Sequence, residues 1–288
     1  MIRRRDRPSE GPAPVRTARQ RRRSTLFLAA SLPVVYVLFC VAARVGYRVL
    51  LYPAPPGAPL SLPADDKVLS LQAEDRVPVV AIELPPPDDR ARTVVIFHAN
   101  GETMDARLPL AMALHAHGLG VVLAEYRGYG LARDAGRPDE AGLYGDASAV
   151  LDALQRQGIG RDRVALLGIS LGTGVAVEMA VRGRAAALVL VSPYTSIPAV
   201  AAAVLPFLPA RWLCPDKFDT LSKVPGLRIP ALLIHGDADE VVPFAMGRQV
   251  AAAIPDATMR VVAGGHHNDL FPTEPRQLLE AIVEAVRR

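Results

Sequence analysis

The segment LLGISLGTGVAVEMA places Ser170 between two glycines, Gly168 and Gly172. An apolar run of strand type precedes the serine, and a pattern of helical type follows it. A G-x-S-x-G pattern at a strand-to-helix junction is typical of a nucleophile elbow, in which a sharp turn exposes the serine hydroxyl. The alternative is a tight turn that contains a small polar residue and performs no chemistry.

Two further segments supply the groups that a serine nucleophile requires. The segment LLIHGDADEVVP contains Asp237 and Asp239, and the segment VVAGGHHNDLF contains His266 and His267. A carboxylate can orient an imidazole, and the imidazole can take the proton of the serine hydroxyl. The chain order serine, acid, histidine is one of those known for such triads. Spacing alone permits either member of each pair.

A fourth segment, VVIFHANGETM, ends its apolar run at His98, and the turn Ala99-Asn100-Gly101 precedes a helical pattern. A backbone N–H of this turn, together with that of Leu171, can stabilise an oxyanion. The alternative is an ordinary turn built on the Asn-Gly dipeptide.

These groups can meet only if the elements that precede them lie side by side. Short runs rich in Val, Ile and Leu without alternation indicate strands buried on both faces, as in a parallel sheet. Helical patterns separate these runs, which predicts an α/β layered domain with its ligand site beyond the carboxyl ends of the strands. The expected strands are 77–84, 93–98, 120–126, 164–169, 186–192, 231–235 and 258–263. The expected helices are 103–117, 139–157, 170–182, 244–253 and 275–286.

From about residue 76 to its C-terminus the chain resembles the α/β-hydrolase superfamily. The segments that carry the resemblance are EYRGYG, GISLG, SPYTSIPAV, HGDADEVVP and GGHHND. Within the superfamily the chain is similar to the membrane-anchored branch with lysophospholipase, monoacylglycerol-lipase and depalmitoylase-like members, and to serine aminopeptidase-like hydrolases. The resemblance implies a mostly parallel central sheet with helices on both faces. The irregular, proline-spotted stretch 194–230 is expected to form a small cap.

The resemblance also implies roles for single residues. The family pattern H-G-x-x-D-x-x-V-P aligns Asp239 with the catalytic acid, and G-H-N-D aligns His267 with the catalytic histidine. Ser170 is then the nucleophile, and the N–H groups of Leu171 and Asn100 form the oxyanion hole.

Four neighbouring residues have less definite roles. Relatives usually have glycine where this chain has Ala99. The added methyl group restricts the backbone conformations that the oxyanion turn can adopt. His98, Tyr126 and Tyr129 are candidate pocket residues, although packing and loop support explain them equally well.

No metal or cofactor is expected. Adjacent histidines such as His266 and His267 rarely converge on one ion. The two cysteines, Cys40 and Cys214, lie in different parts of the chain and indicate neither a zinc site nor an intramolecular disulfide. The expected serine chemistry needs no cofactor.

The N-terminal region has a different character. Residues 1–23 hold nine arginines against Asp6 and Glu10, a net charge of +7. The uncharged run 24–43 follows, and at about 1.5 Å per helical residue it can span about 30 Å of hydrocarbon. We expect a retained single-pass anchor with a cytoplasmic N-terminus and the hydrolase domain on the opposite face. The alternative is a cleaved signal peptide with its cleavage site near 41–43, in which Arg22 and Arg23 resemble a twin-arginine signal.

The net charge of the chain outside its N-terminal region argues against nucleic acid as a partner. The whole chain has a formal net charge of +4, and Arg44 and Arg48 add two positive charges to the +7 of the tail. The chain from Leu51 onward therefore carries a net charge of −5. An acidic body of this kind is not expected to bind nucleic acid.

These observations predict a membrane-anchored serine hydrolase that cleaves a carboxylic ester or thioester, with a lipid or acyl substrate favoured by the anchor. The alternatives are a peptidase of the serine aminopeptidase type and a non-catalytic binding protein on the same fold. The expected domains are an Arg-rich tail (1–23), a transmembrane signal anchor (24–47), a Pro-rich spacer (48–75) and a hydrolase domain (76–288).

Overall fold

The computed structural model describes residues 18–57 and 67–288, with side chains from residue 31 onward. The chain divides into two compact units, one up to Ala43 and the other from Arg44 to Arg288. The expected Arg-rich tail lies mainly outside the described residues.

The first helix, α1 (Ala18–Leu51), has 34 residues and contains Pro33. Its stretch Ser31–Leu51 has a mean hydropathy of 1.9, and its 21 residues are long and apolar enough to cross a membrane. Length and composition therefore make this helix a candidate membrane anchor.

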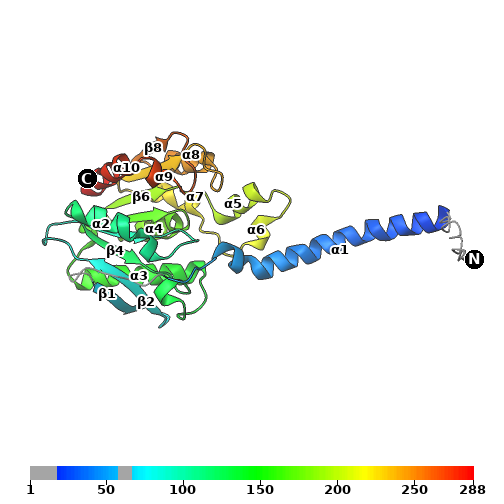
Figure 1. Ribbon diagram of the computed structural model, residues 1–288, viewed down its shortest axis with the longest axis horizontal. Helices are drawn as coiled ribbons and strands as arrows, with labels where there is room; N and C mark the ends of the chain where they lie inside the picture. The colour runs from blue at the N-terminus through cyan, green and yellow to red at the C-terminus, as the bar shows by residue number, and fades with distance from the viewer. Residues whose placement is uncertain (1–17, 58–66) are drawn as a thin grey trace, which may run out of the picture. The chain divides into compact units, whose positions relative to one another are not determined.

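An eight-stranded sheet forms the centre of the second unit (Figure 1), in the strand order β1-β2-β4-β3-β5-β6-β7-β8. The two pairs that involve β2 are antiparallel, and all other pairs are parallel. The strands are β1 (Lys67–Gln72), β2 (Pro78–Leu84), β3 (Thr93–Phe97), β4 (Gly120–Ala124), β5 (Val164–Ile169), β6 (Ala187–Val191), β7 (Ala231–Gly236) and β8 (Ala257–Val262). The expected α/β-hydrolase fold with a mostly parallel sheet is confirmed.

Helices cover both faces of this sheet. One face packs against α3 (Glu140–Arg156), α4 (Leu171–Val181) and α8 (Phe244–Ala253), and their apolar side chains form one buried core. The other face packs against α2 (Leu108–Ala116) and α10 (Pro275–Arg287) around a second core. Strands β3 to β7 are almost entirely buried because both of their faces are covered.

The cap consists of short helices between β6 and β7. They are α5 (Ile197–Val204), α6 (Ala210–Leu213) and α7 (Thr220–Lys223), followed by a 3-10 turn, η4 (Val224–Gly226). Ser196 begins α5 and accepts a hydrogen bond from the N–H of Ala199, as an N-terminal capping residue does. The remaining short elements are η1 (Met104–Arg107), η2 (Gly130–Ala132), η3 (Arg161–Arg163) and α9 (Leu270–Thr273).

The stretch expected to be a spacer, 48–75, contains ordered elements of the hydrolase unit. Its residues 58–66 lie outside the described residues. Tyr52 is buried in the core rather than extended away from the domain, and β1 pairs with β2 along six residues. Strand β1 is not among the expected strands, because it is largely exposed and lacks the continuous apolar run of the inner strands.

Candidate active site

Ser170 lies on a sharp turn between β5 and α4. Its backbone has φ 49° and ψ −114°, a left-handed conformation that a residue other than glycine rarely adopts. The turn is held by a hydrogen bond from the N–H of Ser170 to the carbonyl oxygen of Val191 on β6, at 2.9 Å. Backbone strain of this kind persists where the surrounding structure enforces it, and such sites are frequently functional.

The glycines on either side of Ser170 allow strand and helix to approach closely. A Cβ atom at Gly168 would lie 2.4 Å from the carbonyl oxygen of Gly172, and one at Gly172 would lie 2.1 Å from that of Phe97. Both distances are far below van der Waals contact. The G-x-S-x-G spacing is therefore explained by the backbone packing of β3, β5 and α4.

His267 contacts Ser170 on one side and Asp239 on the other. Its Nε2 atom lies 3.0 Å from Ser170 Oγ, and its Nδ1 atom lies 2.8 Å from Asp239 Oδ2. The three residues follow β5, β7 and β8, whose carboxyl ends meet at the same edge of the sheet because these strands are parallel.

Asp239 accepts several hydrogen bonds. The N–H groups of Val241 and Val242 donate to its Oδ1 atom at 3.0 and 2.8 Å, and His235 Nε2 lies 3.3 Å from its Oδ2 atom. Burial by itself raises the pKa of this carboxyl group, but the hydrogen bonds from His235 and His267 outweigh that effect and hold the pKa well below its usual range. The carboxylate is therefore ionised at neutral pH and fixes a hydrogen on His267 Nδ1, so that Nε2 is free to accept a proton from Ser170.

The neighbouring candidates Asp237 and His266 point elsewhere. Asp237 Oδ1 accepts a hydrogen bond from the N–H of Gly264 at 2.6 Å in an exposed turn. His266 is exposed, and its Nδ1 atom lies 3.0 Å from Glu240 Oε2, an interaction that raises the pKa of the imidazole. The structure thus brings Asp239 and His267, rather than these two, into contact with Ser170.

The expected oxyanion groups lie at the ends of two elements. Leu171 is the first residue of α4, so its N–H is one of the first-turn amides that have no acceptor within the helix. Asn100 follows β3 by three positions. In the same turn, the N–H of Ala99 donates to Glu102 Oε1 at 2.8 Å, and Glu102 is itself bound by Arg107. The carboxylate of Glu102 therefore restrains the turn by holding the backbone N–H of Ala99.

Ala99 occupies its position without left-handed strain. Among the described residues other than glycine, a positive φ occurs at Arg76, Ser170, Ser192 and Phe218. The turn therefore accepts the methyl group that distinguishes this chain from relatives with glycine.

His98, Tyr126 and Tyr129 form a buried group next to this turn. The His98 and Tyr126 rings have centroids 4.1 Å apart, and the Tyr126 hydroxyl donates to the carbonyl oxygen of His98 at 2.9 Å. His98 Nε2 lies 2.9 Å from Glu125 Oε1, with both side chains only 1% exposed. This arrangement supports the turn from inside. Glu125 was not singled out from the sequence, although its place directly after β4 is where such residues are sought.

The last residue of the candidate membrane helix contacts the oxyanion turn, and the next residue contacts the cap. The side-chain amide of Asn100 donates to the carbonyl oxygen of Leu51 at 3.3 Å, and the Tyr52 hydroxyl donates to Asp216 of the cap at 2.8 Å. Burial, followed by the nearby charge of Asp216, raises the pKa of Tyr52 far above its usual range, so the hydroxyl keeps its proton. The first contact joins residues 49 positions apart and the second joins residues 164 positions apart. No local sequence pattern predicts either contact.

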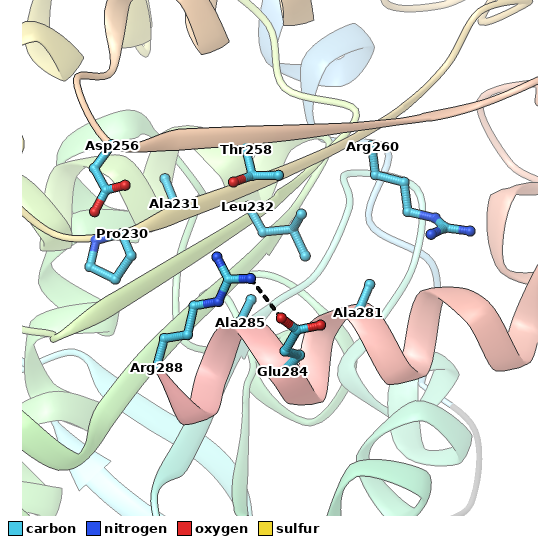
Figure 2. Close-up of a pocket in the computed structure, with 10 residues that line it drawn as sticks. All are labelled: Pro230, Ala231, Leu232, Asp256, Thr258, Arg260, Ala281, Glu284, Ala285 and Arg288. Atoms are coloured by element: carbon cyan, nitrogen blue, oxygen red, sulfur yellow. Dashed lines mark hydrogen bonds and ion pairs between the residues drawn. The ribbon is translucent and has the colours of Figure 1, made fainter.

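A separate hollow of about 160 Å³ lies between β7, β8 and α10. Figure 2 shows the residues that line it. Ala231, the first residue of β7, lines it together with Asp256, which directly precedes β8. The hollow is thus near the amino ends of these strands, whereas Ser170 and His267 follow carboxyl ends. Within the part of the chain that the structure describes, no group of three or more His, Cys, Asp or Glu residues could hold a metal ion.

The fold and the position of the elbow define the class of protein: the chain belongs to the α/β-hydrolase superfamily. The profile of a family described as serine aminopeptidase, S33, matches residues 88–216. This range includes Asn100 and Ser170 but ends before Asp239 and His267. An uncharacterized protein of Mycobacterium tuberculosis is 41% identical over 191 residues, which are 66% of this chain and 67% of the relative.

Two further proteins extend this similarity. The α/β hydrolase domain-containing protein 17C of Mus musculus is 36% identical over 149 residues, 51% of this chain and 44% of the relative. The solved structure of an esterase from Pyrococcus furiosus has a TM-score of 0.67 at 19% identity and covers 82% of this chain and 96% of its own. At that identity the likeness concerns the fold alone.

Proposed function

We propose that this protein is a serine hydrolase that cleaves a carboxylic ester or thioester through an acyl-enzyme on Ser170. The observation that carries the proposal is the continuous hydrogen-bonded contact from Ser170 Oγ to His267 Nε2, at 3.0 Å, and from His267 Nδ1 to Asp239 Oδ2, at 2.8 Å. A strained elbow that aims a hydroxyl at a properly oriented imidazole has the geometry of nucleophilic catalysis.

In the first half of the reaction Ser170 Oγ attacks the carbonyl carbon while His267 Nε2 takes its proton. The electron pair of the carbonyl bond moves to the oxygen, and the N–H groups of Leu171 and Asn100 stabilise the resulting oxyanion. The tetrahedral intermediate then expels the alcohol or thiol, which receives the proton from His267. In the second half, water attacks the carbonyl carbon of the acyl-enzyme while His267 Nε2 takes its proton. The new tetrahedral intermediate breaks its bond to Ser170 Oγ, which receives that proton, and the acid leaves.

Two observations favour an ester or thioester with an acyl chain. The solved structure of similar fold from Pyrococcus furiosus is that of an esterase, and a candidate membrane anchor precedes the hydrolase unit and would hold it near lipid. The description serine aminopeptidase for the matching family profile favours a second candidate, a peptidase acting on short peptides or amino-acid amides.

A substrate panel separates these candidates. The panel contains p-nitrophenyl esters of increasing chain length, a matching thioester and aminoacyl p-nitroanilides, tested with the wild-type chain and Ser170→Ala. We expect turnover of esters by the wild-type chain and a loss of about 10⁴-fold or more in kcat in the variant. Faster turnover of the anilides would support the peptidase. No turnover of any substrate would contradict the proposal and support a non-catalytic binding protein.

The proposal includes a retained anchor with a cytoplasmic N-terminus. It rests on the apolar length of Ser31–Leu51 and on the +7 charge of residues 1–23, because the larger positive cluster usually stays inside. Intact-mass measurement and protease protection on sealed membranes test it. A mature N-terminus at Arg44 would indicate a cleaved signal peptide, and digestion of the hydrolase unit from the cytoplasmic side alone would overturn the orientation.

A further inference from the structure

The cap exposes a set of large apolar side chains. Val204, Phe207 and Trp212 are 57%, 59% and 83% exposed, and Leu205 between them is 36% exposed. We call these four residues the cap face. They belong to α5, α6 and the loop that joins them, two helices that pack against each other. Clustered apolar exposure of this kind marks a site of interaction with a protein or a membrane.

Charged groups lie beside Trp212, one of the four residues of the cap face. Trp212 lines a hollow of about 560 Å³ on the cap, together with Arg211, Lys217 and Asp219. Trp212 thus has two cations and one carboxylate beside it. The centre of a stable protein interface is depleted of charged residues, so these surroundings are unlike it. It resembles the residues found at the membrane–water boundary, where tryptophan lies among the head groups and Lys or Arg contact phosphates.

The cap is also held against the last turn of α1. Asp216 of the cap accepts hydrogen bonds from the hydroxyls of Tyr47, at 3.2 Å, and Tyr52, at 2.8 Å. Arg48 forms an ion pair with Asp139 at 3.0 Å. All of these residues belong to the unit Arg44–Arg288, and the candidate span ends at Leu51. In the proposed anchoring, residues 44–52 therefore join the end of the span to the hydrolase unit and its cap.

We propose that the cap face docks on the lipid surface, with the Trp212 side chain among the head groups. The inference rests on the membrane anchor of the proposed function, since the anchor determines which surface faces lipid. Docking would direct the cap toward the bilayer. The hydrolase unit would then face substrates that partition into the bilayer.

Trp212 provides its own probe, because it is the only tryptophan among the 288 residues. The full chain is reconstituted in phosphatidylcholine vesicles, with and without lipids brominated on the acyl chains, and tryptophan emission is recorded with increasing acrylamide. We expect emission at shorter wavelength than that of the denatured chain, loss of intensity in the brominated vesicles, and weak quenching by acrylamide.

A matched reporter on another surface serves as the control. Met112 on α2 is 47% exposed, and α2 is on the other side of the hydrolase unit from α5 and α6 (Figure 1). In the chain with Trp212→Phe and Met112→Trp, the emission should be insensitive to brominated lipid and strongly quenched by acrylamide. If the native Trp212 behaves like this control, the docking proposal is overturned.

Other outcomes are also decisive. Shielding of Trp212 from acrylamide without quenching by brominated lipid would mean that protein covers the cap face, most simply a second copy of the chain, and would overturn the proposal. Vesicle flotation and hydrolysis of p-nitrophenyl acetate are measured on the same samples. A chain that floats and hydrolyses the ester while Trp212 stays in water would refute docking alone. A chain that does not float would refute both the anchor and the docking, whatever its esterase activity.

Discussion

The Nδ1 atom of His267 lies 2.8 Å from Oδ2 of Asp239, a residue 28 positions earlier in the chain. The Asp239 side chain is fully buried, and that of His267 is only 9% exposed. Because the carboxylate also accepts two backbone hydrogen bonds, its position is set by the turn after β7 and not by the imidazole. The acid is thus a fixed support that determines which nitrogen of His267 faces Ser170.

Asp239→Asn should reduce kcat by about 10⁴-fold, because an amide can donate to His267 and favour the wrong tautomer. The measurement is the kcat and KM of the best ester from the substrate panel. Asp237→Asn is the matched control, since Asp237 is exposed and contacts only the neighbouring turn. The reverse ranking of these two variants would show that the acid is misassigned.

His267→Ala should abolish turnover, whereas His266→Ala should retain most of it. Only His267 reaches Ser170, at 3.0 Å, while His266 pairs with Glu240 on the surface. Single-turnover and steady-state rates with the same ester compare the two variants. Equal losses would contradict the assignment of the general base to His267.

The stability of the fold should depend on Asp239 in acid. Its folded-state pKa is lower than the unfolded value of about 3.9, so its contribution to the free energy of unfolding is present above that value and declines as the pH falls below about 4. Thermal unfolding of the wild-type chain and of Asp239→Asn between pH 7 and pH 2.5 measures this. The difference in Tm should shrink toward low pH. A constant difference would show that the carboxylate is not stabilised as its contacts imply.

The apolar strands were predictable because burial on both faces leaves a continuous run of Val, Leu and Ile, as in β5. The edge strand β1 was not, since its exposed residues make its sequence resemble the preceding spacer. Ser170 and its two glycines were also recognisable, because the close packing in the elbow imposes their spacing.

Contacts between distant parts of the chain could not be derived from local patterns. The hydrogen bond between Tyr52 and Asp216 joins the expected spacer to the cap, and Glu125 contacts His98 from the neighbouring strand. In the sequence alone, each of these four residues could lie in many different structural environments. Only the order of the strands and the path of the chain after α1 bring them together.

Gly172→Ala should destabilise the protein, because the new Cβ would lie 2.1 Å from the carbonyl oxygen of Phe97, a backbone atom that cannot move freely. Overpacking typically costs about 1–3 kcal/mol, and this contact is expected at the upper end of that range or beyond. Thermal unfolding measures it. Gly226→Ala is the control, since a Cβ there would meet nothing within 4 Å. Equal Tm values for the two variants would disprove the proposed packing of the elbow.

The central claim is that Ser170 is the nucleophile, and covalent labelling tests it most directly. The wild-type chain is treated with a fluorophosphonate, which forms a stable bond to an activated serine, and the modified peptide is identified by mass spectrometry. We predict one adduct on Ser170, absent in Ser170→Ala and in His267→Ala and unaffected in His266→Ala. An unlabelled wild-type chain, or an adduct on another serine that persists in Ser170→Ala, would contradict it.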